Sequence, residues 1–522
     1  MNPIPIIDLF AGPGGLGEGF ARAIQGKRPF SIVLSVEKDP VAHQTLILRA
    51  FYRHFKRQGE PVPEAYYEYL AGTTARKELE RAHPKEWAIA DAEALCAELG
   101  REAPGHQPLI DKKIKDALRG VEDWVLIGGP PCQAYSLVGR SRMQKAKDYI
   151  EKRGYSFEKD HRHTLYRQYL RIIAMHSPSI FVMENVKGIL SSKLNGELIF
   201  PQILKDLHEP AVAARQYGWD CAGCRQYRIV SFVTGKEPEK GKEFTYLIRA
   251  EHYGIPQARH RVILLGVRDD IYEKIGGEIS PLKRHKQVGL KGVIGNLPQL
   301  RSGFSKETDS SERWRGYFTK MAGEKWIKGL ERGVRRELLR ALALLKQRDL
   351  PSEYCESGRF ALTLFDGWYA DGGLLGIPNH STRKHMADDL ARYLFVASFG
   401  KAKGRSPHLK DFPEALLPDH KNVDQNDPDQ MFSDRFKVQL WGKPASTITS
   451  HISKDGHYYI HPDPAQCRSL TVREAARIQT FPDSYYFEGG RTQQYHQVGN
   501  AVPPYLAGQL AEIVWGALKQ VR

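Results

Sequence analysis

The sequence of 522 residues is poor in cysteine and has no long hydrophobic run. Six cysteines in a chain of this length are too few for a disulfide framework, which excludes the small secreted scaffolds that depend on one. No run approaches the roughly 18 apolar residues that a membrane span needs. Residues 1–7 are too short for a signal peptide, because Asp8 ends their apolar run. We therefore expect a cytoplasmic protein with reduced thiols.

The Gly-Lys-Ser/Thr run that cradles a triphosphate is also absent, whereas positive charge is abundant. The chain has 77 Lys and Arg residues against 61 Asp and Glu, a formal net charge of +16. This surplus suits a polyanionic partner, since Lys and Arg displace the counterions of phosphates. A generally basic enzyme would have the same composition, so charge alone leaves both interpretations open.

Five short apolar runs predict buried strands of a mostly parallel sheet. They are residues 4–10, 32–36, 124–127, 180–183 and 261–267. Nearly continuous apolar runs separated by helical stretches are what a sheet covered on both faces requires. Charged or small polar residues follow several of these runs, and ligands bind at that edge of open α/β sheets.

The alternation of strands and helices is interrupted twice. Residues 50–118 are charged and helix-forming, which indicates a helical insertion in a first domain spanning 1–285. From 286 to 440 the alternation disappears, which predicts a second, smaller domain. Residues 441–522 are expected to return to the first domain. The predicted fold class is α/β, a doubly wound sheet with a smaller domain inserted.

The glycine-rich turn after the first predicted strand has the residues of a nucleoside-binding site. Phe10, Gly12 and Gly14 lie in this turn, and Glu37 ends the next predicted strand. Glycines let the backbone approach a ligand, and a carboxylate at this point can bind two ribose hydroxyls. A tight strand-to-helix connection without a ligand would also explain the glycines.

A cysteine motif follows the third predicted strand. In G-P-P-C-Q, Pro130 and Pro131 fix the path of the chain and Cys132 lies just beyond the strand end. The thiolate is the reactive form of cysteine, and this position would present it to a ligand. The alternative is a small buried cysteine after a turn, and the prolines and the strand-end position count against it.

Charged residues also mark the fourth and fifth predicted strands. Glu184 closes the fourth, where it is either a solvated strand terminus or an acid/base partner acting on the cysteine's substrate. Arg259 and Arg261 open the fifth and are expected to point together, because alternate residues of a strand share a face. The two arginines are either a solvated pair at the edge of the sheet, or guanidiniums that act, beside the carboxylate, on a bound base.

Taken together and in this order, the motifs closely resemble those of the cytosine-C5 DNA methyltransferases. The resemblance is carried by D-L-F-A-G-P-G-G, Glu37, G-P-P-C-Q, E-N-V, Q-A-R-H-R, T-V-R-E-A-A-R-I-Q-T-F-P-D and Q-V-G-N-A-V-P-P. It implies the fold of the S-adenosylmethionine-dependent methyltransferases. Residues 1–285 would then be the catalytic and cofactor-binding domain, 286–440 the target-recognition domain, and 441–522 the segment that completes the catalytic domain.

The resemblance also implies a role for individual residues. Those that match the S-adenosylmethionine site are Phe10, Gly12, Gly14, Glu37, Asn500, Ala501 and Val502. Those that match the catalytic site are the nucleophile Cys132, the base-binding carboxylate Glu184, and the paired arginines Arg259 and Arg261. Thr447 resembles a threonine that supports the recognition domain. The family's acidic turn for the cofactor adenine is not clear here, and Asp111 lies at about the right distance before Cys132.

The implied reaction transfers a methyl group to C5 of cytosine in a specific double-stranded DNA sequence. It proceeds through a covalent bond from Cys132 to C6 of a base flipped out of the duplex. A transfer-RNA cytosine methyltransferase and a catalytically silent DNA-binding relative are the alternatives. The length of the region between Arg268 and Thr447 favours DNA, and the intact catalytic residues count against a silent relative.

Further expectations concern partners and location. We expect a monomer in the cytoplasm, associated with the nucleoid, with a cognate restriction endonuclease as a candidate partner. No metal is expected, because Cys221 and Cys224 have ligand spacing but no second matching pair. A basic helix is expected between 324 and 348. Its arginines 332, 335, 336 and 340 either contact phosphates or form the solvated face opposite Leu338, Leu339, Leu342 and Leu345.

Overall fold

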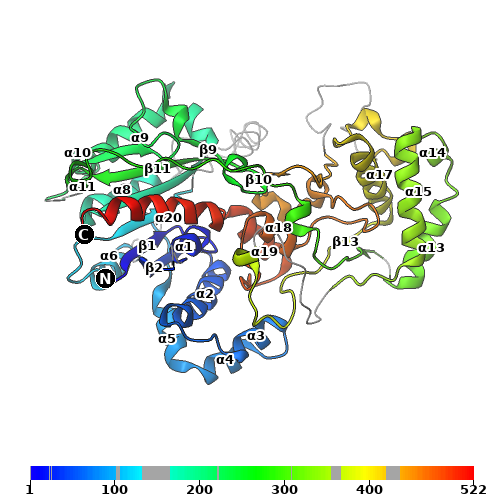
Figure 1. Ribbon diagram of the computed structural model, residues 1–522, viewed down its shortest axis with the longest axis horizontal. Coiled ribbons are helices and arrows are strands. Elements are labelled where there is room, and N and C mark those ends of the chain that lie inside the picture. Colours follow the sequence, from blue (N-terminus) through cyan, green and yellow to red (C-terminus); the bar gives the residue numbers. More distant parts are fainter. Residues whose placement is uncertain are drawn as a thin grey trace, which may run out of the picture.

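The computed structural model of the chain describes residues 2–22, 24, 26–100, 106–131, 165–194, 196–219, 221, 223–306, 308–353, 366–418 and 435–522. The molecule has two lobes with an irregular region between them (Figure 1). The larger lobe is built around an eight-stranded sheet, and the smaller lobe is mainly helical. Among the described residues, no helix is both long enough and apolar enough to cross a bilayer.

The sheet of the larger lobe has the strand order β3-β2-β1-β4-β5-β11-β8, and β9 pairs with β11 outside this path. The first five strands of this order are parallel, whereas β11 is antiparallel to β5, β8 and β9. The bounds are β1 (Ile4–Leu9), β2 (Phe30–Glu37), β3 (Ala94–Cys96), β4 (Val125–Gly128), β5 (Ile180–Val186), β8 (Tyr227–Ser231), β9 (Leu247–Arg249) and β11 (His260–Arg268).

All five predicted strands are present, and the doubly wound, mostly parallel α/β fold is confirmed. The fifth strand, β11, runs antiparallel to β5, a direction that its apolar pattern did not specify. The expected helical insertion at 50–118 is mostly helical, but it also contains one strand that was not predicted. Ala94–Cys96 forms β3 and pairs with β2, which extends the sheet at that edge. A strand of three residues is too short to show a periodic pattern within charged, helix-forming sequence.

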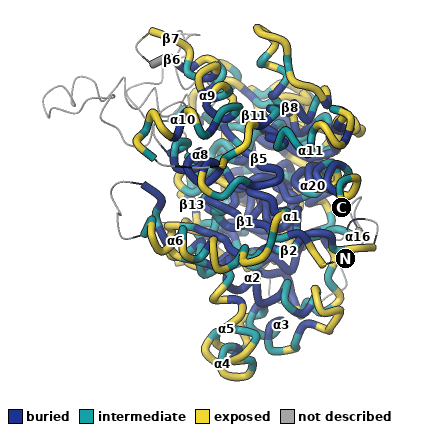
Figure 2. Tube along the Cα trace, turned by 90° about the vertical axis from the view of Figure 1, so that its left-hand side faces the viewer, coloured by how far each residue is buried: buried dark blue, intermediate teal, exposed yellow. Residues whose placement is uncertain are grey.

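Helices cover both faces of the sheet. Because successive strand residues point to opposite faces, Ile4 and Ile6 pack with α1 and α20, whereas Ile7 and Leu9 pack with α6 and α8. The strands at the centre of the sheet are correspondingly buried (Figure 2). The covering helices are α1 (Gly15–Phe20), α6 (His106–Ala117), α8 (Leu165–His176), α9 (Ile199–His208), α10 (Pro210–Gln216), α11 (Asp269–Lys274) and α20 (Pro504–Leu518).

Four helices form a cluster beside β2 and β3, at the lower end of the larger lobe in Figure 1. They are α2 (Pro40–Gln58), α3 (Glu64–Ala71), α4 (Arg76–Ala82) and α5 (Pro84–Glu93). Aromatic side chains dominate the small core of this cluster, including Phe51, Tyr66 and Tyr67. The outer sides of α4 and α5 are exposed (Figure 2).

The smaller lobe has a hydrophobic core of its own, formed mainly by α13 (Ser311–Met321), α15 (Arg332–Gln347) and α17 (Ala387–Lys403). On α15, the leucines 338, 342 and 345 are buried, and the arginines 332, 335, 336 and 340 are exposed. Leu339 was expected to pack inward but is 41% exposed, because it lies between exposed arginines on the outer side of the helix. The short elements of this lobe are α14 (Lys325–Lys328), β12 (Gly303–Phe304) and β13 (Lys384–His385).

The region between the lobes is built from segments that are distant in the sequence. Leu290 and Val293 share a core with Ile448 and Ile478 of the C-terminal segment. Its regular elements are β10 (Gln257–Ala258), α12 (Lys291–Ile294), α16 (Asp366–Tyr369), β14 (Ala445–Ser446), α18 (Val472–Ile478) and α19 (Arg491–Asn500). The remaining hairpin, β6 (Lys193–Leu194) with β7 (Glu197–Leu198), lies in the larger lobe.

Candidate active site

The turn between β1 and α1 is held in an unusual backbone conformation. Phe10, Gly12 and Gly14 have φ angles of 56°, 57° and 89°, in the left-handed region. A non-glycine residue such as Phe10 rarely adopts this conformation, and such residues concentrate at ligand sites. A Cβ atom on Gly14 would lie 2.9 Å from the Tyr485 hydroxyl, which itself donates a hydrogen bond to the carbonyl of Pro13. The turn is therefore fixed from outside as well as by its own sequence.

Glu37 lies beside this turn at the end of β2. Its Oε2 accepts a hydrogen bond from the Gly12 amide at 2.7 Å, and its Oε1 accepts one from the Asp39 amide at 2.8 Å. Burial raises the pKa of this carboxyl above its usual value. Because a carboxylate can accept about four hydrogen bonds, each oxygen still has a free acceptor position. These positions fit a pair of ribose hydroxyls.

The other side of the turn is closed by Ala501 and Val502. A Cβ atom on Gly15 would lie 2.2 Å from the carbonyl oxygen of Val502 and 3.3 Å from Cβ of Ala501. Gln479 holds this segment, since its Nε2 donates to the carbonyls of Val498 at 2.7 Å and Ala501 at 3.2 Å. The glycine turn, Glu37, Ala501 and Val502 thus lie at one edge of the sheet, where ligands bind in open α/β folds.

Asp111 is not part of this group of residues. It lies on α6, and its carboxylate pairs with Arg171 at 2.8 Å and with His176 at 3.6 Å, both on α8. The strand end that lies opposite Glu37 is Cys96 of β3. The spacing before Cys132 therefore selected a residue on α6, whereas the strand end beside Glu37 belongs to β3, which was not predicted from the sequence.

Glu184 and Arg261 form an ion pair across the ends of β5 and β11. Arg261 Nε lies 2.7 Å from Glu184 Oε1, and the two side chains are only 15% and 14% exposed. Gly129 lies against the same carboxylate, since a Cβ atom there would be 3.1 Å from Glu184 Oε2. Cys132 itself lies outside the described residues, which reach Pro131 on this side. The chain that leads to Cys132 therefore passes directly beside the Glu184–Arg261 pair.

Arg259 has a different environment from Arg261. It is buried, and it donates hydrogen bonds to the carbonyls of Ile448 at 2.7 Å and Gly499 at 3.2 Å. Burial, reinforced by the positive charge of Arg261, holds its pKa well below the usual value. The two arginines were expected to point together, but Arg259 lies between β10 and β11, where strand alternation does not continue. Its contacts tie the edge of the sheet to the C-terminal segment.

Two glutamines, Gln257 and Gln479, also connect the sheet edge to the C-terminal segment, although no role was predicted for them. Gln257 Oε1 accepts from the Ile448 amide at 2.7 Å, and its Nε2 donates to Gln479 Oε1 at 2.9 Å. Thr447 Oγ1 donates to the Ala258 carbonyl at 2.6 Å, next to the pairing of β10 with β14. Thr447 thus lies at the junction of the sheet and the region between the lobes.

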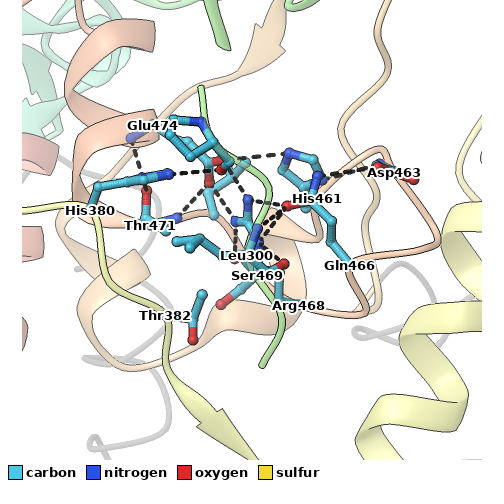
Figure 3. A network of polar contacts seen from close by, with 12 residues as sticks. Leu300, His380, Thr382, His461, Asp463, Gln466, Arg468, Ser469, Thr471 and Glu474 are labelled. Atoms are coloured by element: carbon cyan, nitrogen blue, oxygen red, sulfur yellow. Dashed lines mark hydrogen bonds and ion pairs between the residues drawn. The ribbon is translucent and has the colours of Figure 1, made fainter. Parts of the chain in front are cut away.

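A buried polar network surrounds Glu474 at the start of α18 (Figure 3). Its carboxylate pairs with both terminal nitrogens of Arg468 at 2.6 Å, lies 3.4 Å from His461, and accepts from the Thr471 amide at 2.8 Å. Arg468 and His461 hold the pKa of Glu474 well below its usual value despite burial. His380 joins through Thr471 Oγ1 at 2.9 Å and the Pro298 carbonyl at 3.1 Å. The network fastens the segments around Pro298, His380 and His461 to the start of α18.

Metal ligands do not gather anywhere in the part of the chain that the structure describes. No group of three or more His, Cys, Asp or Glu side chains is arranged to hold an ion there. At the cysteine pair noted in the sequence, burial raises the pKa of the Cys224 thiol to about 11, which disfavours the thiolate that a metal would need.

Comparison with known proteins places these features in a family. A model of the C-5 cytosine-specific DNA methylases matches residues 104–515. The chain is similar to the type II methyltransferase M.Bpa9945I of Bacillus paralicheniformis, with 33% identity and 98% of each chain covered. It is also similar to the DNA (cytosine-5-)-methyltransferase M.ApeKI of Aeropyrum pernix, with 26% identity over 77% of this chain and 83% of that one. The chain therefore belongs to the C-5 cytosine-specific DNA methylase family.

Proposed function

We propose that this chain methylates C5 of cytosine in a specific double-stranded DNA sequence, with S-adenosylmethionine as the methyl donor and Cys132 as the nucleophile. The observation that carries the proposal is the Glu184–Arg261 pair, whose atoms lie 2.7 Å apart beside the chain that leads to Cys132. The pair combines a carboxylate and a guanidinium at the edge of the sheet where ligands bind. This is the combination that activation of a cytosine ring needs.

The residues of the site have complementary tasks. C5 of cytosine is a poor nucleophile, so the Cys132 thiolate first forms a bond to C6 and pushes electron density towards N3 and O2. Glu184 shares a proton with N3 and Arg261 stabilises the charge at O2, as general acid catalysis and electrostatic stabilisation require. After methylation, the C5 proton leaves to a base, the bond between sulfur and C6 breaks, and the thiolate is restored.

We assign Arg259 a positioning role in the same site. Both of its hydrogen bonds go to backbone carbonyls, so it acts by holding Ile448 and Gly499 against the sheet edge that carries Arg261. A base stacked in a duplex could not reach Glu184, so the target nucleotide must be flipped out, at a cost of roughly a few kcal/mol. The rigid tie around Arg259 supports the pocket that would receive this base.

The cofactor site is proposed at the glycine turn. Glu37 would bind the ribose, the backbone at Gly12 and Gly14 would lie against the nucleoside, and Phe10 and residues 500–502 would enclose it. When bound, S-adenosylmethionine supplies an electrophilic methyl group on its sulfonium sulfur. The turn follows β1 and Glu184 lies near the end of β5, and only β4 separates these two strands in the sheet, so the donor and the base would meet at that edge.

The setting proposed for the enzyme is a bacterial restriction-modification system. The relatives reported above include a type II methyltransferase, which supports a cognate restriction endonuclease that recognises the same DNA sequence. We propose that residues 286–440 recognise the target and that the enzyme acts in the cytoplasm on nucleoid DNA as a monomer. A transfer-RNA substrate is the main competing proposal.

The test supplies methyl-labelled S-adenosylmethionine with double-stranded DNA and with transfer RNA in separate reactions. We expect label in DNA alone, at 5-methylcytosine within one sequence. Glu184→Gln is the matched inactive variant, because it keeps the shape of the side chain. Label in transfer RNA, or in adenine of DNA, would contradict the proposal.

A further inference from the structure

A groove lies where the smaller lobe meets the C-terminal segment, with a volume of about 440 Å³. One wall is β13 and the start of α17, and the other wall is residues 451–457. Four cationic side chains line it, Arg383, Lys384, Arg435 and Lys454, against two carboxylates, Asp389 and Asp455. We call it the junction groove.

Its two carboxylates are already engaged within the protein. Asp389 is buried and pairs with Arg392 at 2.9 Å, and Asp455 accepts a hydrogen bond from the His457 amide at 2.9 Å. Lys384 and Lys454 are exposed, and neither forms an ion pair within the described residues. The groove therefore presents positive charge that its own carboxylates do not neutralise.

The floor of the groove is polar but uncharged. The Tyr393 hydroxyl lies 2.9 Å from Nδ1 of His457 and 3.4 Å from Nδ1 of His385. Burial lowers the pKa of His385 to about 3 and also lowers that of His457. The positive charge of the groove therefore belongs to its lysine and arginine side chains and not to these histidines.

The walls are held rigidly. Arg383 of the first wall donates a hydrogen bond to the Ile452 carbonyl of the second wall, and this bond connects the two walls at one end. The guanidinium of Arg383 also lies 4.0 Å from the centre of the Tyr495 ring. A Cβ atom on Gly456 would lie 2.9 Å from Ser469 Oγ, so this turn is packed closely against the chain behind it. A rigid, cationic groove suits a ligand with fixed geometry better than a mobile counterion.

The groove also adjoins the proposed catalytic site along the chain. Ile448, whose carbonyl accepts from Arg259, lies three residues before His451 in the groove wall. A Cβ atom on Gly499, the other partner of Arg259, would lie 2.3 Å from the amide nitrogen of Ser450. The element that ties the sheet edge therefore continues directly into the groove.

From these observations we propose that the junction groove binds a phosphodiester of the DNA backbone, with Lys384 and Lys454 as the contacts. The inference rests on the proposed function, because it takes double-stranded DNA as the substrate. Lysine carries a compact point charge on a flexible side chain, which suits a phosphate oxygen. A phosphate held here would set the position of the duplex relative to Glu184 without selecting a sequence.

The first test measures how the dissociation constant for duplex DNA changes with salt concentration. Each neutralised phosphate contributes roughly 0.9 to the log–log slope, so Lys384→Gln/Lys454→Gln, which removes the contact to one phosphodiester, should reduce the slope by roughly 0.9. The loss should be equal for target and non-target duplexes. The control is Lys77→Gln/Lys519→Gln, two exposed lysines on α4 and after α20, which should leave the slope unchanged.

The second test scans the duplex with single neutral methylphosphonate substitutions. At one backbone position the methylphosphonate should weaken binding of the wild type but not of the double variant. The reason is that the neutral DNA backbone and the lysine substitutions remove the same contact. An unchanged salt slope, or a variant that keeps the wild-type scan, would overturn the inference. So would a relaxed choice of target sequence, since that would make the groove a reader of bases.

These readouts separate the inference from the proposed function. They need only DNA binding, so they can be measured without methyl transfer. A reduced slope together with label found in transfer RNA would leave a phosphate-binding groove and refute the DNA reaction. An unchanged slope together with methylated cytosine in DNA would refute the phosphate-binding groove and support the proposed reaction.

Discussion

At the scale of single residues, the site depends on a carboxylate held in place by a guanidinium. Arg261 fixes Glu184 at 2.7 Å, and Gly129 leaves room for that carboxylate because it has no side chain. Any larger residue at position 129 would press on Glu184. The proposed chemistry therefore rests on the placement of Glu184 as much as on its acidity.

Replacing Glu184 with glutamine tests this role. Glu184→Gln keeps the shape but cannot share a proton with N3, so we expect methyl transfer to fall by about 100-fold or more. Affinity for S-adenosylmethionine, measured by calorimetry, should hardly change. Glu197→Gln, on the exposed hairpin β6–β7, is the matched control. Near-normal turnover of Glu184→Gln would mean that the carboxylate is only a strand terminus.

Asp8 yields a prediction about pH. It is fully buried beneath the glycine turn, neither of its oxygens has a hydrogen-bond partner in the described structure, and burial raises its pKa to about 8. Between about pH 4 and pH 8 the unfolded chain has lost this proton while the folded protein keeps it, so stability falls as pH rises. Asp8→Asn should remove this dependence.

Thermal unfolding measures this effect. The Tm of Asp8→Asn minus that of the wild type should become more positive by a few degrees from pH 5 to pH 8. Asp91→Asn, at an exposed position of α5, should show a difference that does not depend on pH. A constant difference for Asp8→Asn would mean that the buried carboxyl does not resist ionisation.

The types and order of residues in the sequence predicted which residues lie at the site, but not what surrounds each of them. Glu37, Glu184 and Arg261 lie where strand ends predicted them. The surroundings of Arg259 could not be predicted, because its partners are backbone carbonyls about 190 and 240 positions away in the sequence. Every residue has a backbone carbonyl, so the residue types in a sequence do not indicate which carbonyl accepts a hydrogen bond.

At the scale of elements, the strongly apolar strands were predictable and the short or mixed ones were not. β1, β4 and β5 are nearly all apolar and fully covered, so composition identified them. β3 has three residues, and its role depends on pairing with β2. The direction of β11 was also hidden, because an apolar run has the same pattern in parallel and antiparallel pairs.

The network around Glu474 yields a prediction at this scale. Glu474 and Arg468 are both about 1% exposed, so removal of either charge leaves the other buried and unpaired. Such a loss costs about 3–5 kcal/mol, and Glu474→Gln or Arg468→Met should lower Tm accordingly. The double variant should be more stable than the sum of the two losses predicts. Additive losses in urea unfolding would show that the pair is not coupled.

At the scale of the whole molecule, our proposal assigns the chemistry to the larger lobe and target recognition to the smaller one. The sheet of the larger lobe carries the proposed chemistry, and the smaller lobe has a core of its own. Replacing residues 286–440 with those of a relative that has another target should transfer the choice of sequence. Bisulfite sequencing of methylated DNA reads the outcome. An active chimaera that still modifies the original site would place recognition outside this segment.

The covalent step at Cys132 is the central claim, and one measurement tests it directly. A target duplex with 5-fluorocytosine should trap the enzyme, because fluorine cannot leave C5 as a proton does. We predict one adduct per chain when S-adenosylmethionine is present, mapped to Cys132 by peptide mass spectrometry. It should be lost in Cys132→Ala and kept in Cys224→Ser. An adduct on any other cysteine, or none with an active enzyme, would contradict the account.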